Sequence, residues 1–342
     1  MTRFTRLITT SLAALSLGVP AVQADLVVLQ YHHVADDTPR ATSTSRSLFE
    51  AQLEMIAELD LEVVPLLAAT RSALAGETSG NHIAITFDDA YQSVYQTAAP
   101  LLERFGFPYT IFVNTDAVGK RGYMTWDQLA EVAADRHVTI ANHSADHGHL
   151  ARKPGEPEAR WHQRVDASLD RAREALEEKL HVDNPMFAYP YGEFDKALED
   201  KLSERGWLGF GQQSGAIGAY SHDTRLPRFP MANAYGQLGS LKDKLLSKAF
   251  PVDASQLPDG VVSQNPPVLT FDPGSKLNAR QLTCFASGQG RIDFQQDGTK
   301  IRVQAPKAFE SRRFRYNCTH PAGDGSYYWL SQQWLNLEAP ED

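Results

Sequence analysis

The sequence predicts an α/β fold built on a parallel sheet, followed by a smaller antiparallel β domain. Up to about residue 249, short β-like runs alternate with segments whose apolar residues recur every three or four positions, the period of an amphipathic helix. Alternation of this kind indicates a parallel sheet covered by helices, either open or closed as a barrel. From about Pro251 the helical period is lost and short alternating runs follow, which is typical of antiparallel strands.

The expected parallel strands are six short apolar runs: Leu26–Gln30, His82–Phe87, Tyr109–Val113, Val138–Asn142, Met186–Tyr189 and Leu208–Gly211. The clearest expected helix covers about 161–180, where the apolar residues are Trp161, Val165, Leu169, Ala172, Leu176 and Leu180. In folds of this class, functional residues gather at the carboxyl ends of the strands.

Residues 25–250 are therefore expected to form the α/β domain, 251–266 a proline-rich linker and 267–342 a β domain resembling a sandwich. Asp297-Gly298 lies between two alternating runs and is a strong hairpin signal. Only two cysteines occur, Cys284 and Cys318, and in an exported protein such a pair indicates one disulfide.

Two tryptophans on the last expected strand, Trp329 and Trp334, have two interpretations. They are either part of the core of the β domain or part of a surface on which sugar rings stack. Because they lie an odd number of residues apart, they face opposite sides of a regular strand, so at most one serves such a surface.

The N-terminus predicts export. Arg3 and Arg6 precede an uncharged stretch, and small residues before Asp25 suit a signal peptidase, so we expect residues 1–24 to be a signal peptide. The alternative is a retained N-terminal anchor. The destination would be periplasmic or extracellular, without stable membrane insertion, because no apolar run is long enough to span a bilayer. With 42 acidic against 33 basic residues, the net charge of −9 argues against a nucleic-acid partner.

Adjacent carboxylates end the second expected strand. Asp88 and Asp89 follow His82–Phe87, and two neighbouring carboxylates oppose each other's ionisation unless a cation takes one of them. One would then be a metal ligand and the other a free base. The alternative is that the pair only opens a turn or caps the next helix.

Two histidines four residues apart follow another strand. His143 and His147 lie near enough to share a metal, and with one aspartate they supply the three protein ligands of a catalytic zinc site. The alternative is a pair of surface histidines. We expect His149 to pack against its neighbours and not to be a fourth ligand.

Two more strand ends carry polar candidates. Pro190-Tyr191-Gly192 forms a turn that could present the Tyr191 backbone N–H to a substrate oxygen, or it could be a simple strand-to-helix turn. His32 closes the first expected strand on the same rim, where an ordinary loop histidine is the alternative reading.

Together these motifs resemble the polysaccharide deacetylases with a NodB homology domain, the family-4 carbohydrate esterases. The resemblance covers about residues 26–250 and rests on Thr86-Phe87-Asp88-Asp89, His143-Ser144-x-x-His147 and Pro190-Tyr191-Gly192. It implies a distorted (β/α) barrel of fewer than eight strands and metal-dependent de-N-acetylation. In that scheme Asp88 is the general base, Asp89, His143 and His147 hold the metal, and the Tyr191 N–H binds the oxyanion.

The chain departs from the common family pattern at two positions. Ala188 stands where most members have an arginine that tethers the base, and Leu226-Pro227-Arg228 stands where most have a leucine and a catalytic histidine. The same absences characterise the branch resembling poly-β-1,6-N-acetylglucosamine de-N-acetylases, where the first strand supplies the acid. This comparison assigns His32 as the acid, with His222 in reserve, and Arg228 as the tether.

The expected function is that of an exported hydrolase that removes acetyl groups from an N-acetylglucosamine polymer, with a divalent metal such as Zn²⁺, Co²⁺ or Ni²⁺. Three substrates compete: a β-1,6-linked exopolysaccharide, peptidoglycan and chitin oligomers. The alternative is a glycan-binding protein that kept the barrel and lost turnover, as Ala188 and the absent late histidine would allow.

Overall fold

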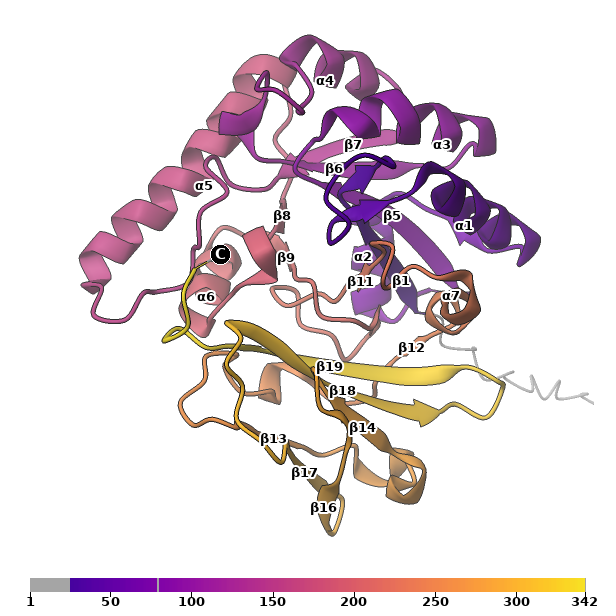
Figure 1. Cartoon of the computed structure of the whole chain (residues 1–342), viewed down its shortest axis with the longest axis vertical. Helices are drawn as coiled ribbons and strands as arrows, with labels where there is room; N and C mark the ends of the chain where they lie inside the picture. Colours follow the sequence, from indigo (N-terminus) through magenta and orange to yellow (C-terminus); the bar gives the residue numbers. More distant parts are fainter. Residues whose placement is uncertain (1–24, 79, 342) are drawn as a thin grey trace, which may run out of the picture.

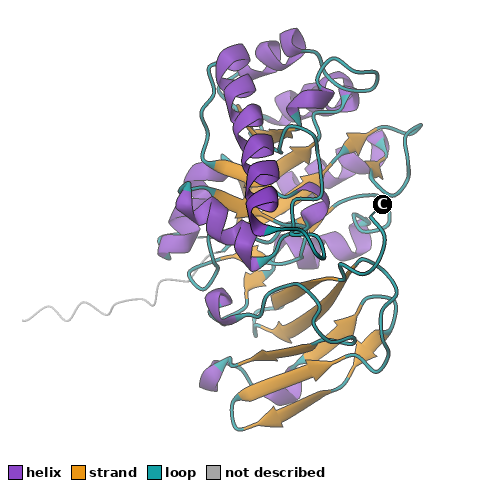
Figure 2. Cartoon of the chain, turned by 90° about the vertical axis from the view of Figure 1, so that its left-hand side faces the viewer, coloured by secondary structure: helices purple, strands orange, loops and turns teal. Residues whose placement is uncertain are grey.

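The computed structural model describes residues 25–78 and 80–341, so the expected signal peptide lies outside the described residues. Helices surround a central sheet in the upper part of Figure 1, and the C-terminal strands form a separate layer below it. The turned view in Figure 2 shows the same division into a helix-covered part and a part made mainly of strands. Among the described residues, no helix is both long and apolar enough to cross a membrane.

Six parallel strands follow one another in chain order across the main sheet: β1 (Leu26–Tyr31), β5 (His82–Asp88), β6 (Tyr109–Val113), β7 (Val138–Asn142), β8 (Met186–Ala188) and β9 (Leu208–Phe210). All six expected runs are strands, with bounds shifted by at most a residue. Shorter strands extend the sheet: β4 (Glu62–Val63) beside β5, and β10 (Ala216–Ile217) and β11 (Phe229–Pro230) beside β1.

The segment 226–230 connects the two ends of this parallel series. Leu226 forms a bridge with Phe210 of β9, and β11, which begins three residues further on, pairs in parallel with β1. The sheet therefore curves back on itself with fewer than eight main strands, which confirms the distorted barrel predicted from the sequence.

The helices cover the outer side of the sheet: α1 (Arg46–Glu58), α2 (Leu66–Ala75), α3 (Ala99–Phe105), α4 (Trp126–Ala133), α5 (Glu158–Leu180), α6 (Lys196–Glu204) and α7 (Leu238–Leu245). The α5 helix buries the predicted apolar face, including Trp161, Val165 and Leu169. It ends at His181, which adopts the left-handed conformation that closes many helices. The helix expected after Asp89 begins with a π-helical turn, Val94–Ala98, and continues as α3.

Two sheets, antiparallel except where β12 joins, make up the C-terminal part. One has the order β12 (Lys248–Ala249), β19 (Tyr327–Leu335), β18 (Arg313–Pro321), β14 (Thr283–Ala286) and β15 (Gly290–Ile292). The other has the order β13 (Val268–Phe271), β17 (Lys300–Gln304) and β16 (Phe294–Asp297). The predicted hairpin at Asp297-Gly298 joins β16 to β17. The predicted disulfide joins Cys284 to Cys318, which lie opposite each other on β14 and β18.

The tryptophans of β19 face opposite sides, as their spacing predicts. Trp334 lies in the core between the C-terminal sheets and is 3% exposed. Trp329 instead packs against the barrel, with its ring edge-to-face on Phe229 at 5.2 Å between centroids. Both rings therefore serve packing, and neither belongs to an open stacking surface.

The short strand β12 pairs in parallel with β19. Lys248 and Ala249, which precede the expected linker, are therefore part of the C-terminal sheet.

Candidate active site

The carboxyl ends of the parallel strands carry a cluster of unusual backbone conformations. Among the described residues, seven other than glycine have a positive φ, and five of these lie in the loops that follow β5, β7 and β8: Asp89, Ala90, Ser144, His147 and Tyr191. Such conformations cost about 1–3 kcal/mol each and persist where the surrounding structure enforces them, typically at functional sites.

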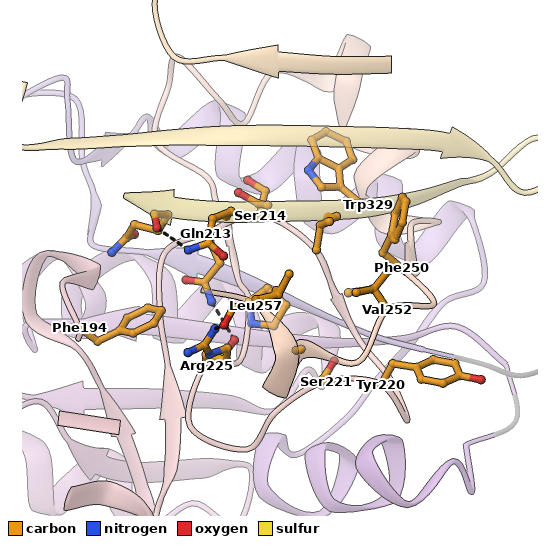
Figure 3. Close-up of a pocket in the computed structure, with 17 residues that line it drawn as sticks. Phe194, Gln213, Ser214, Tyr220, Ser221, Arg225, Phe250, Val252, Leu257 and Trp329 are labelled. Carbon is orange, nitrogen blue, oxygen red and sulfur yellow. Dashed lines mark hydrogen bonds between the residues drawn. The ribbon is translucent and has the colours of Figure 1, made fainter. Parts of the chain in front are cut away.

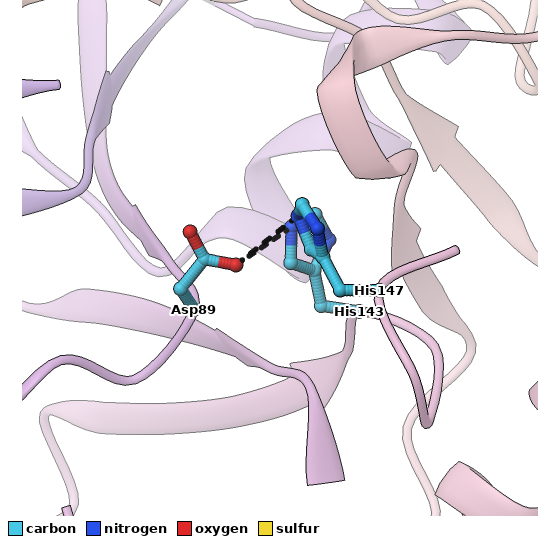
Figure 4. Close-up of side chains that lie close together, drawn as sticks. All are labelled: Asp89, His143 and His147. Atoms are coloured by element: carbon cyan, nitrogen blue, oxygen red, sulfur yellow. Dashed lines mark ion pairs between the residues drawn. The ribbon is translucent and has the colours of Figure 1, made fainter. Parts of the chain in front are cut away.

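Asp89, His143 and His147 converge at this rim (Figure 4). The Asp89 Oδ1 atom lies 3.5 Å from His143 Nε2 and 3.2 Å from His147 Nε2. The ligand atoms of all three side chains lie within 4.8 Å of one another. Two rim segments separated by more than fifty residues thus bring an oxygen and two ring nitrogens to one point.

Hydrogen bonds from neighbouring strands orient these groups. The His143 Nδ1 atom lies 2.7 Å from the Ala188 carbonyl oxygen, so it carries the proton and leaves Nε2 as an acceptor facing Asp89. The Asn114 side-chain amide, just beyond β6, donates to Asp89 Oδ1 at 3.2 Å. The turn that carries His147 is closed by its backbone N–H, which donates to Ser144 Oγ at 3.1 Å.

The charge states of these three residues suit a cation. Burial lowers the pKa of His143 to about 3 and also lowers the pKa of His147, so both imidazoles are neutral and can coordinate a metal. Burial raises the pKa of Asp89 to about 6, opposed by His32 and reinforced by the neighbouring Asp88 carboxylate. A positive ion at this point would favour the ionised form of Asp89.

A divalent metal fits the donor set. The His143 Nε2 atom is buried without a hydrogen-bond partner, which is costly unless a ligand satisfies it. Zinc sites with bonds of about 2.0–2.1 Å have neighbouring ligand atoms roughly 3.3 Å apart in tetrahedral geometry. The two distances to Asp89 Oδ1, 3.5 and 3.2 Å, match that spacing. Two nitrogens and one carboxylate oxygen are also a ligand set that catalytic zinc accepts.

Asp88 is held apart from the three ligands by Arg228. The guanidinium donates from Nη1 to Asp88 Oδ1 at 2.7 Å and from Nη2 to Oδ2 at 2.8 Å, and both side chains are fully buried. Burial opposes ionisation of Asp88 most strongly, but the charge and hydrogen bonds of Arg228, together with the nearby histidines, outweigh it and hold the pKa of Asp88 below its usual range. Asp88 is therefore a carboxylate at neutral pH, and Oδ1, with one hydrogen bond shown, retains a lone pair for a proton.

Barrel closure explains how Arg228 reaches this position. It lies between Leu226, which bridges to β9, and Phe229, which pairs with β1. Its Nε donates to the Gly211 carbonyl at 2.8 Å, which fixes the guanidinium against the neighbouring strand end. The contact with Asp88 that the resemblance assigns to an arginine at position 188 is thus made by Arg228, directly before β11.

Sequence reasoning missed two supporting side chains, Gln30 and Asn114. The Gln30 Nε2 atom donates to Asp88 Oδ2 at 2.7 Å. Gln30 is the polar member of an otherwise apolar and fully buried stretch of β1, and Asn114 directly follows β6. Gln30 could have been found as a polar residue near the carboxyl end of a buried strand. Asn114 could have been found because functional residues gather at the carboxyl ends of parallel strands.

The two candidate acids lie in different surroundings. His32 directly follows β1 and is half-buried, and its charge acts on both Asp88 and Asp89. His222 lies 2.9 Å from the Thr224 hydroxyl and 3.1 Å from Asp223, and it belongs to the loop between β10 and β11. The adjacent His33 stacks on Tyr91 at 3.6 Å between ring centroids and serves packing.

Tyr191 lies next to the metal-ligand candidates in a tight turn. Its ring packs against His147 at 4.5 Å and face to face on His149 at 4.1 Å. The following Gly192 has a φ of 68°, and a Cβ there would lie 2.7 Å from the Gln212 side chain, so glycine is required. His149 therefore has the packing role expected of it, and its Nδ1 lies 2.8 Å from the Glu193 carboxylate.

Comparison with known proteins agrees with this geometry. The model of the family described as "Polysaccharide deacetylase" matches residues 75–208, which include Asp88, Asp89, both histidines and Tyr191. These residues are thus similar to a polysaccharide deacetylase domain. The structure of IcaB from Ammonifex degensii resembles this one with a TM-score of 0.55 at 25% identity, covering 64% of this chain and 94% of that one.

Relatives of the deacetylase domain belong to the branch that the sequence indicated. The poly-β-1,6-N-acetyl-D-glucosamine N-deacetylase of Escherichia coli K12 is 26% identical over 246 residues, covering 60% of this chain and 36% of that protein. The enzyme of the same name from Staphylococcus aureus MRSA252 is 23% identical over 193 residues, covering 54% of this chain and 67% of that protein. The chain thus spans little more than a third of the length of the Escherichia coli relative. Both relatives are named as N-deacetylases.

Proposed function

We propose that this chain is an exported, metal-dependent de-N-acetylase that acts on a polymer containing N-acetylglucosamine. The observation that carries the proposal is the separation of two neighbouring carboxylates. Asp89 joins two neutral imidazoles, while Arg228 pairs with Asp88 and keeps it outside that group. A site of this kind can hold a cation and still offer a base to water.

Asp89, His143 and His147 would hold the ion, with Zn²⁺ the best match and Co²⁺ or Ni²⁺ as alternatives. When bound, such an ion supplies Lewis acidity at the acetamide carbonyl and makes water more acidic. The remaining steps belong to the side chains and backbone of the rim.

In the proposed reaction, water adds to the acetamide carbonyl carbon while Asp88 Oδ1 accepts its proton. The Tyr191 backbone N–H donates to the carbonyl oxygen as negative charge develops there. His32 then gives a proton to the amide nitrogen as the C–N bond breaks, because an amine leaves poorly without one. The products are acetate and a glucosamine amine.

The substrate we favour is a β-1,6-linked N-acetylglucosamine polymer. Two features support it: the acid candidate at the end of the first strand, and the similarity to relatives named poly-β-1,6-N-acetyl-D-glucosamine N-deacetylases. Peptidoglycan and chitin oligomers are the competing substrates. The glycan-binding alternative drew on the absence of a tether at Ala188, and the contact between Arg228 and Asp88 removes that argument.

The test is acetate release by the full chain loaded with Zn²⁺, Co²⁺ or Ni²⁺, on each of the three glycans. We expect release from the β-1,6-linked polymer, and a loss of about 10²–10⁴-fold in Asp88→Asn. Lys201→Gln is the matched control, because Lys201 pairs with Asp166 on the outer helices. Metal-loaded protein that binds glycan and releases no acetate would establish the binding alternative instead.

A further inference from the structure

Glu193 directly follows the turn that carries Tyr191, and its carboxylate is completely buried. Arg312 contacts both carboxylate oxygens, from Nε at 2.8 Å and from Nη2 at 3.0 Å. Arg313 donates from Nη1 at 2.8 Å, and His149 Nδ1 completes the group at 2.8 Å. Each oxygen of Glu193 therefore has two partners, and three of the four contacts come from arginines.

Both arginines belong to the C-terminal part of the chain, at the start of β18, whereas Glu193 and His149 belong to the barrel. A second contact comes from β19, where the Gln333 side-chain amide donates to the Gly192 carbonyl oxygen. The C-terminal sheet thus contacts two consecutive residues of the loop, Gly192 and Glu193, directly after Tyr191.

One of the two arginines, Arg313, also contacts the tyrosine. The Arg313 guanidinium carbon lies 5.2 Å from the centroid of the Tyr191 ring, within the range of a cation–π contact. The ring also stacks on His149 with an angle of 3° between the planes, and His149 is itself bound to Glu193. The ring of Tyr191, whose backbone is held at a φ of 58°, is therefore contacted by residues of both parts of the chain.

Part of the contact between the barrel and the C-terminal sheets is not closely packed. A cavity of about 60 Å³ lies between β19 and the barrel, lined among others by Phe194, Gln213 and Trp329 (Figure 3). It has room for a few water molecules. Buried polar atoms at its edge, Gln213 Oε1, Trp329 Nε1 and Ser331 Oγ, have no protein partner. Beside this cavity, the Glu193 cluster is a contact between the two parts in which every carboxylate oxygen is paired.

We infer that Arg312, Arg313 and Gln333 of the C-terminal sheets are positioning residues for the Tyr191 turn. Through Glu193 and Gly192 they hold the Tyr191 N–H at the place where the carbonyl oxygen of the substrate develops charge. This inference rests on the proposed function for its catalytic consequence. The C-terminal β region is then an integral part of the active site and not a separate glycan-binding attachment.

The experiment compares Arg312→Gln, Arg312→Lys and Gln333→Ala with Lys201→Gln in the full chain. Lys201 makes a half-buried ion pair between α5 and α6, so its variant controls for a general loss of stability. Kinetics of acetate release and hydrogen exchange of residues 189–195 are measured for each. Hydrogen exchange needs neither metal nor substrate, so it reports on the turn independently of activity.

We expect faster exchange at residues 189–195 in Arg312→Gln and Gln333→Ala, and a kcat lowered by about 10²-fold in Arg312→Gln, since a displacement of about 1 Å at a reacting group has an effect of that size. KM should change much less, because the contact acts on the transition state. Arg312→Lys keeps the charge but cannot contact both oxygens, so it should lie between the wild type and Arg312→Gln.

Unchanged exchange at 189–195 in both Arg312→Gln and Gln333→Ala would overturn the inference, as would the same change in Lys201→Gln. A kcat of Arg312→Gln equal to that of the control would overturn its catalytic part. A wild type that releases no acetate from any glycan would overturn the proposed function, and the exchange measurement would still decide whether the C-terminal sheets hold the turn.

Discussion

Replacement of Arg228 by glutamine should be among the most damaging single changes in the barrel. The guanidinium and the Asp88 carboxylate are both fully buried and share two short hydrogen bonds. Removal of one partner of such a pair leaves an uncompensated charge and costs about 3–5 kcal/mol. For a domain of this size each kcal/mol lowers Tm by about 2–4 °C, so the expected fall is about 6–20 °C.

The same change should impair catalysis. Without Arg228, burial acts unopposed on Asp88 and raises its pKa, so the carboxylate takes up a proton and can no longer serve as a base. Because general base catalysis contributes about 10²–10⁴-fold, kcat for acetate release at neutral pH should fall by at least about 10²-fold. Arg171→Gln is the matched control: Arg171 pairs with Asp116 at the surface, where such pairs contribute about 0–1 kcal/mol.

A double-mutant cycle separates the pair from its surroundings. Arg228→Gln, Asp88→Asn and the double variant are compared by thermal and denaturant unfolding. If the two groups form one ionised pair, the double variant loses both charges together and should show a coupling of about 2–3 kcal/mol, in the upper part of the range for residues in contact. Additivity to within about 0.5 kcal/mol would refute the buried ion pair, and with it the explanation of how Asp88 stays ionised.

Other predictions follow from the same structure. His32→Ala should lower acetate release from an amide by about 10²–10⁴-fold but leave hydrolysis of 4-nitrophenyl acetate nearly intact, because a nitrophenolate leaves without a proton; equal losses on both substrates would contradict the role of an acid. Chelation should abolish activity and Zn²⁺ should restore it, whereas His143→Ala should bind less than one equivalent of Zn²⁺ under the same conditions; full binding by this variant would exclude His143 as a ligand. Because the contacts of Glu193 lower its pKa to about 2 from 4.5, its cluster should stabilise the fold above about pH 4.5 and lose that contribution as the pH falls toward 2. Glu193→Gln should flatten this part of the Tm profile, and an unchanged slope would argue against the cluster. Replacement of Cys284 and Cys318 by serine opens a loop with a separation of 34 residues and should cost about 4 kcal/mol, seen as faster hydrogen exchange in β14 and β18; unchanged exchange there would contradict it.

Local sequence patterns were sufficient to predict most of the strands of the barrel. Apolar runs bounded by turn residues predicted all six parallel strands, because a strand buried on both faces must be apolar throughout. The sequence alone then predicted Asp88, His143, Tyr191 and His32 on one rim, since parallel strands all end at the same edge.

The motif-bearing residues were thus predictable from the sequence, but the residues that hold them were not. Gln30 binds Asp88 from within β1, and its role depends on the register of two neighbouring strands. Arg228 was expected as a tether from the resemblance alone, and only the closure of the barrel between β9 and β1 brings it to the carboxylate.

The sequence alone determined the alternation of strands and helices, the strand ends that carry polar side chains and the cysteine pair. Each of these depends on residues close together in the chain or on composition. Only the tertiary structure decided that Asp89 meets two imidazoles, that Arg228 closes on Asp88 and that the C-terminal sheet contacts the turn after Tyr191. Contacts of this kind join segments 50 to 140 positions apart, and their distances depend on the packing of the whole fold. No local pattern encodes those distances.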